Sequence, residues 1–304
     1  MELRHLRYFV AVVEEQSFTK AAEKLFIAQP PLSRQIQNLE AELGIQLFER
    51  GSRPLKTTEA GQFFYQHALK LLSNAEELKS MTKRIGLADR TVTIGFVGSL
   101  LFGLLSNIVY LFKQNHPNLK IEMIEMSTTQ QIQALKEGKI DVGFGRLRIS
   151  DPDVKRILLR KERLMVAVHA SHPFATKQEG VYLADVVNEQ IFLYPNHNKP
   201  NFSTQVRGIF SEYGLNPQDI REVRELQLAL GFVAANIGVC VVPESAQSIH
   251  LSHLRYVPIL DESAVSPIFM AVRQMDESED IRALFDSVYQ VYDLENITFE
   301  RAVF

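Results

Sequence analysis

The sequence predicts a mixed α+β and α/β protein, in which a winged helix-turn-helix precedes a long helix and a larger α/β region. Three observations predict this order. Two short helical segments within residues 17–43 are joined by a four-residue break, and the second opens with two prolines. Apolar residues then recur at alternating steps of four and three along residues 59–87. From residue 91, strand-like and helix-like segments alternate. We therefore expect three parts: 1–58, 59–87 and 91–304.

The first three helices each have an apolar face or a recognisable end. The apolar stripe of the first helix consists of Leu6, Phe9, Val10 and Val13. Ser17 is expected to cap the second helix, because its side chain can accept a hydrogen bond from the first turn. Pro30 and Pro31 suit the first turn of the third helix, where no N–H donor is needed, and Gly44 suits its end.

A helix-turn-helix of this layout places its second helix in the major groove of DNA. Polar and cationic side chains lie off the apolar stripe of that helix and at the start of the helix before it. Side chains of these types bind phosphates and base edges. The candidate DNA-binding residues in these helices are Thr19, Lys20, Gln29, Pro30, Pro31, Ser33, Arg34, Gln35 and Asn38.

Residues 46–57 are expected to form a β-hairpin wing. Two short segments flank Gly51-Ser52-Arg53, which is typical of a turn. Arg50 and Arg53 would then lie near the tip, where an arginine can enter the narrow minor groove of DNA. A surface helical hairpin with ordinary solvated charges is the alternative for residues 17–43, because bare patterns of this kind also occur by chance.

Residues 59–87 are expected to form one rod-like helix of roughly 40 Å at 1.5 Å per residue. Thr58 can cap it. Its apolar seam consists of Phe64, Ala68, Leu71, Ala75, Leu78, Thr82 and Ile85. A narrow seam on so long a helix favours a second copy as its partner, since helix-turn-helix proteins commonly bind DNA as dimers. The alternative is a helix that packs on the core of its own chain.

The region from residue 91 shows the alternation that predicts parallel sheets covered by helices, with ligands at the carboxyl ends of the strands. The expected strands are 91–96, 119–126, 142–145, 164–169, 191–194, 239–242, 254–258 and 268–272. The expected helices are 100–115, 130–137, 202–213, 226–235 and 281–292.

Several of these helices begin with side chains suited to an anion. Ser99, Thr128 and Ser203 lie at helix starts, where free N–H groups point outward, and Arg146 follows a predicted strand. Taken singly, each hydroxyl is equally explained by helix capping. Together they suit a small dianion with an apolar body, such as cis,cis-muconate. The candidate ligand-binding residues are Gly98, Ser99, Leu100, Leu105, Thr128, Phe144, Arg146, Pro200, Asn201, Phe202, Ser203, Leu226 and Ile268.

Glu225 is the candidate for a conformational switch. It precedes a predicted helix and could pair with Arg146 when no ligand is bound. A carboxylate ligand would then compete for Arg146 and shift the conformational equilibrium.

Composition and charge favour a cytoplasmic DNA-binding protein with no membrane segment. The single cysteine, Cys240, allows no internal disulfide, and no signal peptide is recognisable. Residues 91–112 carry no charge, but their glycines and polar residues favour a buried strand and helix over a membrane span. Residues 1–87 contain 12 Lys+Arg against 10 Asp+Glu, so the acidic remainder of the net charge of −3 lies in the later part. Nucleic-acid binding is therefore expected in the first part.

The sequence does not favour catalysis, a metal or a cofactor. Two histidine pairs, His169/His172 and His250/His253, have the spacing of metal ligands, but no cysteine or carboxylate cluster accompanies them. No nucleophile elbow, P-loop or dinucleotide-binding glycine motif is present in the sequence. A DNA-architectural protein without a ligand remains the competing class, which leaves the α/β region without a role.

The whole chain resembles LysR-type bacterial transcriptional regulators. The resemblance lies in Phe18-Thr19-Lys20-Ala21-Ala22, Gln29-Pro30-Pro31-Leu32-Ser33, Leu39-Glu40, Leu43-Gly44, Leu47-Phe48-Glu49-Arg50 and Thr58-Glu59-Ala60-Gly61. It departs at Ala28, where the family often has serine, and at Pro31, where it often has alanine or serine. A narrower likeness to muconate-responsive regulators of catechol and benzoate degradation lies in residues 1–9, 98–101, 199–202 and 227–231.

The resemblance implies a homotetramer built from homodimers that binds promoter DNA and activates transcription, with RNA polymerase as a further partner. It implies cis,cis-muconate as the effector, with a different aromatic acid or a chlorinated muconate as the alternative. It also implies a two-lobed fold like that of periplasmic binding proteins. Lobe I would comprise residues 91–161 and 268–304, and lobe II residues 162–267, with crossovers near 160–162 and 266–268.

Overall fold

The computed structural model describes residues 1–49, 51–52, 54–86, 90–297 and 299. The chain divides into two compact units, Met1–Gly86 and Leu87–Phe304. None of the described helices is long and apolar enough to cross a lipid bilayer. Each unit is built around a core of its own.

The described residues of the first unit form the helices α1 (Leu3–Glu15), α2 (Phe18–Lys24), α3 (Gln29–Leu43) and α4 (Glu59–Gly86). The predicted helix ends are confirmed: Ser17 caps α2 by accepting from the N–H of Lys20, and Gly44 ends α3 in the left-handed region at φ 71°. Phe9 lies at the centre of the core, where its ring is 5.2 Å from that of Phe48 and 5.0 Å from that of Phe64. Close packing of these rings fixes the three short helices against the start of α4.

The predicted β-hairpin wing is wrong in detail. Between α3 and α4, one isolated antiparallel bridge joins Phe48 to Thr57, and the described residues of this segment contain no strand. Side-chain hydrogen bonds of Ser52 stand in place of further strand pairing. Its Oγ donates to the carbonyl of Glu49 and accepts from the N–H of Lys56. The wing is therefore a loop closed by one bridge and a serine side chain. Arg50 and Arg53 lie outside the described residues.

Gly61, in the first turn of α4, permits the closest approach between α4 and the loop that follows α3. A Cβ on Gly61 would lie 2.0 Å from the carbonyl oxygen of Leu47. The same carbonyl accepts from the N–H of Thr58, whose hydroxyl donates to the carbonyl of Gln46. Thr58 thus holds the Leu47 carbonyl through its N–H and the adjacent Gln46 carbonyl through its hydroxyl, so this backbone is anchored beside Gly61.

We expect Gly61→Ala to destabilise the first unit by about 1–3 kcal/mol, which is the usual cost of overpacking. Urea denaturation followed by circular dichroism would measure the loss. Gly208→Ala is the matched control, since Gly208 lies inside a helix with open space around it and the change should be neutral or slightly stabilising. Equal stability of Gly61→Ala and wild type would show that the loop after α3 is mobile.

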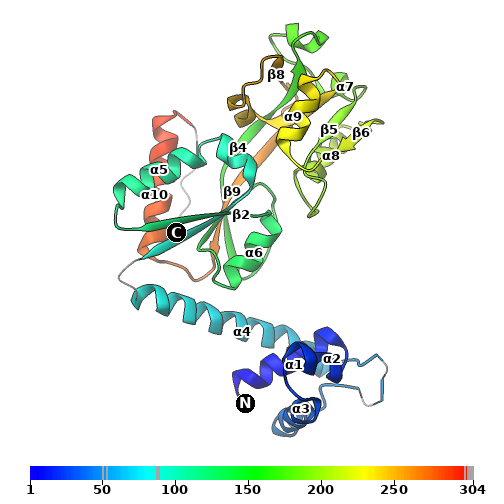
Figure 1. The fold of residues 1–304 in the computed structure, drawn as a ribbon, viewed down its shortest axis with the longest axis vertical. Coiled ribbons are helices and arrows are strands. Elements are labelled where there is room, and N and C mark those ends of the chain that lie inside the picture. Colours follow the sequence, from blue (N-terminus) through cyan, green and yellow to red (C-terminus); the bar gives the residue numbers. More distant parts are fainter. Residues whose placement is uncertain (50, 53, 87–89, 298, 300–304) are drawn as a thin grey trace. The chain divides into compact units, whose positions relative to one another are not determined.

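The second unit is built on two sheets that share their longest strands. The first sheet has the order β2 (Lys120–Glu125), β1 (Thr91–Phe96), β3 (Val142–Gly145), β9 (Val265–Arg273) and β4 (Val154–His169). The second continues from β4 to β7 (Val239–Pro243), β5 (Ile191–Leu193) and β6 (Ile220–Glu222), with β8 (Leu254–Pro258) on the other side of β4. Figure 1 shows β4 and β9 running from one sheet into the other. The two lobes are therefore joined by these antiparallel strands.

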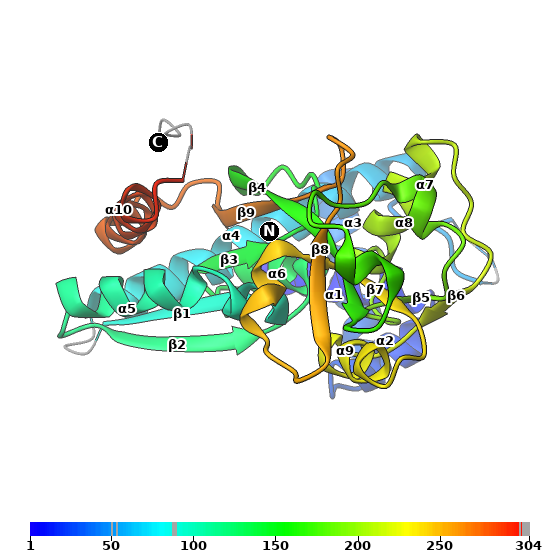
Figure 2. The ribbon, with the colours of Figure 1, turned by 90° about the horizontal axis from the view of Figure 1, so that it is seen from above.

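Helices cover both sheets. In the first lobe, α5 (Leu105–Asn115) packs against α10 (Glu279–Leu294), and α6 (Thr128–Lys136) lies against β3. Figure 2 shows α5 lying along β1 and β2. In the second lobe, α8 (Phe202–Glu212) contacts β5 and α9 (Leu226–Ala234) contacts β4 and β7, while the short α7 (Leu183–Val186) also contributes to the core.

Two predictions for this unit need correction. The helix expected over residues 100–115 is interrupted: a 3-10 turn, Gly98–Phe102, precedes α5, and the break at Gly103 lies where a Cβ would be 3.2 Å from Ser245. The strand expected over residues 164–169 begins at Val154 instead, and β6 was not predicted. The break at Gly103 and the early start of β4 have a tertiary cause, since both involve residues more than 80 positions away in the chain.

Candidate functional site

The predicted DNA-binding residues of the first unit lie on the outer faces of α2 and α3. The side chains of Thr19, Lys20, Gln29, Pro30, Pro31, Arg34 and Asn38 are exposed, and those of Ser33 and Gln35 are half-buried. The opposite face of α3 is buried through Leu32, Ile36 and Leu39. The helix therefore presents one polar face outward, with Arg34 and Asn38 on it, as a helix in the major groove would need.

Two residues that the sequence did not single out organise this surface. Glu40 is 8% exposed, and its Oε1 accepts from the N–H groups of Leu47 at 2.7 Å and Phe48 at 3.2 Å. This carboxylate ties α3 to the start of the wing loop. His5, on α1, lies with Nε2 2.9 Å from the side-chain oxygen of Gln35. Neither role has a local sequence signal, because both partners come from other elements.

The predicted seam on α4 is divided between two environments. Ala68 packs with Leu6 and Val10 of α1, and Phe64 is partly buried beside them. Further along, Leu71 is 48% exposed and Leu78 is 68% exposed. The first part of the seam therefore packs within its own chain, as the alternative prediction held, whereas the second part leaves apolar side chains on the surface. Ile85 lies in a segment whose side chains are not described.

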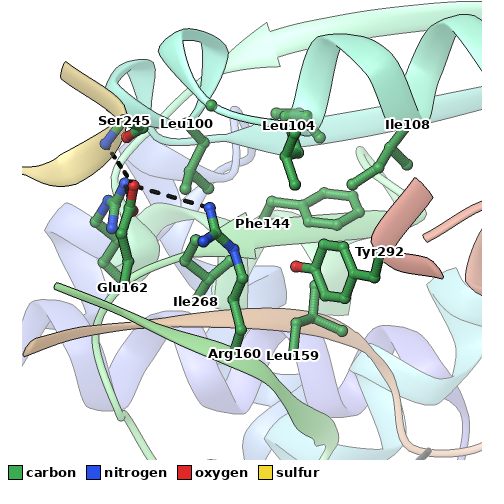
Figure 3. A pocket seen from close by; sticks show the side chains of 13 residues that line it. Leu100, Leu104, Ile108, Phe144, Leu159, Arg160, Glu162, Ser245, Ile268 and Tyr292 are labelled. Atoms are coloured by element: carbon green, nitrogen blue, oxygen red, sulfur yellow. Dashed lines mark hydrogen bonds and ion pairs between the residues drawn. The ribbon is translucent and has the colours of Figure 1, made fainter. Parts of the chain in front are cut away.

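A small cavity lies in the second unit where β3, β4 and β9 meet the 3-10 turn and α5. Figure 3 shows it between Phe144, Leu104, Arg160 and Tyr292. Its volume is about 20 Å³, room for about one water molecule. The lining residues are Leu100, Gly103, Leu104, Leu105, Ile108, Phe144, Arg146, Leu159, Arg160, Glu162, Ser245, Ile268 and Tyr292. The lining is thus mostly apolar, with a group of charged side chains at one end.

Glu162 is the centre of that charged group. Its Oε2 lies 2.6 Å from Nη2 of Arg146, its Oε1 lies 3.8 Å from Nη2 of Arg160, and Oε1 accepts from the N–H of Ser245 at 2.7 Å. Burial acts to raise the pKa of Glu162, but Arg146, the Ser245 N–H and Arg160 outweigh it and hold the pKa below its usual range. Glu162 is therefore a carboxylate at neutral pH and links two arginines.

Arg160 and Tyr292 form the second polar edge of the cavity. The Arg160 guanidinium lies 6.0 Å from the centre of the Tyr292 ring, and its Nε has no hydrogen-bond partner among the described residues. Burial raises the pKa of Tyr292 to about 12, although Arg160 acts in the opposite direction. Tyr292 is thus a neutral hydroxyl, and Arg160 keeps donor capacity for an anion.

The structure brings together five predicted ligand residues and separates the rest. Leu100, Leu105, Phe144, Arg146 and Ile268 all line the cavity. The remaining predicted positions do not line it, and they are Gly98, Ser99, Thr128, Pro200, Asn201, Phe202, Ser203 and Leu226. Of these, Ser99 is directly connected to it, because its Oγ accepts from Nε of Arg146 at 3.0 Å.

The predicted helix start is corrected for α6 and confirmed for α8. Ser127, rather than Thr128, caps α6, and Thr128 is the first helical residue, 3% exposed beside Gly145. Asn201 caps α8 by accepting from the N–H of Thr204. The side chain at the start of a predicted helix was therefore correctly assigned for α8 and displaced by one residue for α6.

Ser203 has a protein partner that sequence reasoning missed. It is fully buried, and its hydroxyl donates to Oε1 of Glu222 at 3.1 Å. Glu222 also accepts from Lys199 at 3.1 Å and Arg207 at 3.1 Å. The hydroxyl thus supports the loop before α8, whereas the neighbouring Phe202 ring lies 5.2 Å from the ring of Tyr194.

The predicted pair between Glu225 and Arg146 is wrong for this structure. Glu225 is exposed at the start of α9, and the carboxylate beside Arg146 is that of Glu162. Glu162 lies on β4 where that strand crosses between the lobes, and Arg146 directly follows β3. The charged segment 160–163 lies inside a strand, which is a sequence feature that points to buried charge. The sequence does not show which of these charges pairs with Arg146.

The histidines that were paired by sequence spacing do not face each other in the structure. His169 and His253 face each other across β4 and β8, with ring centres 5.5 Å apart, whereas His172 lies 3.5 Å from Glu189. No group of three or more His, Cys, Asp or Glu side chains with the geometry of a metal site occurs in the part of the chain that the structure describes.

Comparison with known protein families covers nearly the whole chain. Residues 3–62 match the family described as bacterial regulatory helix-turn-helix protein, lysR family. Residues 86–293 match the family described as LysR substrate binding domain. The chain is 65% identical to the HTH-type transcriptional regulator BenM of Acinetobacter baylyi over 98% of each chain. It is 41% identical to the HTH-type transcriptional regulator CatR of Pseudomonas putida, over 91% of this chain and 95% of the relative.

Solved structures give the same match. Full-length BenM superposes with a TM-score of 0.69 at 64% identity, covering 99% of this chain and 100% of the other. The BenM effector binding domain with its effector benzoate gives 0.68 at 58% identity, covering 69% of this chain and 95% of the other. Full-length CbnR complexed with its target DNA gives 0.62 at 28% identity, covering 95% and 99%. Both units of the chain therefore have counterparts of known structure.

Proposed function

The chain belongs to the LysR family of bacterial transcriptional regulators, and from this we propose that it activates genes for the degradation of aromatic compounds in response to cis,cis-muconate. Its relatives are transcriptional regulators, so the chain is a regulator and not an enzyme. In this proposal the helix-turn-helix unit binds promoter DNA, and the second unit binds the effector.

The observation that carries the effector proposal is the buried guanidinium of Arg146. The side chain is 3% exposed, Nε is held by Ser99, and Nη1 makes no hydrogen bond within the described residues. A buried cationic donor without a full set of acceptors is costly, and a carboxylate would supply charge-assisted hydrogen bonds. An organic anion is therefore the ligand that this group favours.

The apolar residues around Arg146 support a short unsaturated body for that anion. Leu100, Phe144 and Ile268 line the same cavity as Arg146. The start of α8, capped by Asn201, could receive the second carboxylate, because helix N-termini favour negative charge. This combination supports cis,cis-muconate, a small dicarboxylate with a planar carbon chain.

An aromatic monocarboxylate is the second candidate effector, and the cavity favours it. Arg160 would bind its carboxylate, Tyr292 would donate a hydrogen bond, and Leu104, Ile108 and Phe144 would contact the ring. BenM has been solved with its effector benzoate, and this chain is 58% identical to that domain. Because the cavity holds about 20 Å³, entry of a benzoate-sized ligand requires side chains such as Arg160 to move.

Assembly is proposed to follow from α4. Leu71 and Leu78 are exposed apolar side chains seven residues apart on one helix, the spacing of a coiled-coil seam. A second copy that covers them would give a dimer with two helix-turn-helix units for two half-sites, and two dimers would give the proposed tetramer. RNA polymerase is the proposed partner in activation.

Thermal-shift measurements on the full chain with cis,cis-muconate, benzoate and the dimethyl ester of muconate would test the effector proposal. We expect a concentration-dependent rise in Tm with either acid and none with the uncharged ester, because the ester removes the charge that Arg146 would bind. A footprint of a bound promoter fragment with and without the acids would then show whether the protected length changes.

A response to the ester as strong as to the acid would contradict the role of Arg146. An unchanged Tm and footprint with both acids would contradict the proposed function and favour a DNA-architectural protein.

A further inference from the structure

Gln35 lies on α3 at the border between the buried and exposed faces of the helix, on the side toward α1. Its side chain is half-buried, whereas its neighbour Arg34 is exposed. The side-chain oxygen Oε1 of Gln35 lies 2.9 Å from Nε2 of His5, which belongs to α1 and is 30 residues away in sequence. One atom of this candidate DNA-binding side chain is thus engaged inside the protein.

The other ring nitrogen of His5 decides which way the hydrogen bond runs. Nδ1 accepts from the backbone N–H of Glu2 at 3.1 Å, as part of the capping box at the start of α1. A neutral imidazole carries one N–H, so a lone pair on Nδ1 places the hydrogen on Nε2. His5 therefore donates to Oε1 of Gln35, and the backbone at Glu2 sets the tautomer.

This hydrogen bond fixes the orientation of the side-chain amide of Gln35. A free glutamine can pair with adenine through both its oxygen and its amide nitrogen. Because His5 donates to one lone pair of Oε1, the amide is held in one orientation, and its NH₂ group is the donor that it presents away from His5. An acceptor on the DNA is the partner that completes it.

We propose that His5 is a positioning residue for DNA binding, which holds Gln35 so that its amide N–H groups donate to one phosphate oxygen. A phosphate is favoured over a base edge because Gln35 lies on the flank of α3, whereas Arg34 and Asn38 occupy the exposed face that enters the groove. Phosphate contacts of this kind fix the register of the helix and carry no base preference.

A double-mutant cycle on the full chain tests this. The probe is a duplex selected from random DNA by the wild-type protein, and the readout is its affinity at fixed salt. We expect Gln35→Ala to weaken binding by about tenfold to a hundredfold, as for one hydrogen bond to a charged acceptor. His5→Ala should produce most of that loss, and the double variant should bind no more weakly than Gln35→Ala. The conservative His5→Gln, which keeps an acceptor and a donor, should restore most of the affinity.

Gln37→Ala provides the matched control, because Gln37 is exposed on the other flank of α3. Its effect should add to that of His5→Ala, since the two share no contact. Phosphate ethylation interference should lose one and the same position in Gln35→Ala and His5→Ala. Additive losses for His5 and Gln35, or an altered base preference with an unchanged interference pattern, would overturn the proposal.

Discussion

Replacing Arg273 with methionine is expected to destabilise the second unit by about 3–5 kcal/mol, because the change leaves buried carboxylates without their cation. Arg273 is 2% exposed at the end of β9. Its Nη2 lies 3.1 Å from Asp141 and 2.6 Å from Asp276, and its Nη1 donates to the carbonyl of Ile140 at 2.7 Å. The side chain thus joins β9 to the loop before β3 and to the turn before α10.

The pH dependence of this variant has a definite sign. Burial acts to raise the pKa of Asp276, but Arg273 and hydrogen bonds from Ser278 outweigh it and hold the pKa below its usual range. In wild type the carboxylate therefore adds stability above the unfolded-state pKa, and this is lost as the pH falls through the folded-state pKa. In Arg273→Met the cation is lost and only the hydrogen bonds from Ser278 oppose the effect of burial, so the charged form of Asp276 is less favourable and its protonation relieves part of the destabilisation. The difference between the two proteins should narrow below about pH 4.

Urea denaturation of both proteins across a pH series would measure this. Arg282→Met is the matched control: its guanidinium pairs with Glu277 at 3.3 Å on the surface, and removal should change stability by less than about 1 kcal/mol. A loss for Arg273→Met as small as that for the control would mean that Asp141 and Asp276 are solvated in solution.

Replacing Arg146 with methionine is expected to weaken effector binding by about 2–4 kcal/mol, a 30- to 1000-fold loss, because a buried charge pair with the ligand is removed. The guanidinium is held by Ser99 and Glu162, so its position in wild type is already set before a ligand arrives. A preorganised donor contributes more to binding than a mobile one.

Isothermal titration with cis,cis-muconate would measure the loss of affinity. Arg148→Met, two residues later and exposed, is the control and should bind as wild type does. Affinity for DNA without effector should be the same in all three proteins, and urea denaturation should show that the second unit of Arg146→Met is still folded, which separates a failed effector site from a misfolded one. If Arg146→Met bound cis,cis-muconate as tightly as wild type does, the effector would bind elsewhere.

Local signals in the sequence were enough for the first unit. Ser17, Pro30, Pro31 and Gly44 mark helix ends by their own chemistry, and the structure places them there. The wing was predicted less well, since its shape depends on the hydroxyl of Ser52 and the carboxylate of Glu40 rather than on strand propensity. Family resemblance identified the regulator class, and the comparisons confirm that class.

The ligand region shows the limit of reading along the chain. Arg146, Phe144 and Ile268 could be proposed because each lies in, begins or directly follows a predicted strand, and they do line the cavity. Arg160, Glu162 and Tyr292 were missed, because they come from the middle of β4 and the inner face of α10. Arg146 was wrongly paired with Glu225 because its true partner, Glu162, also comes from the middle of β4.

The sequence by itself determined the order of the elements, the succession of helix-turn-helix, long helix and α/β region, and the polar face of α3. These follow from caps, apolar periodicity and turn residues, which act over a few positions. The tertiary structure alone decided that Glu162 pairs with Arg146, that the helix breaks at Gly103, and that His5 holds Gln35. Each of these contacts joins segments distant in sequence, and the energy that selects them comes from burial and charge pairing that exist only once the strands and helices have assembled.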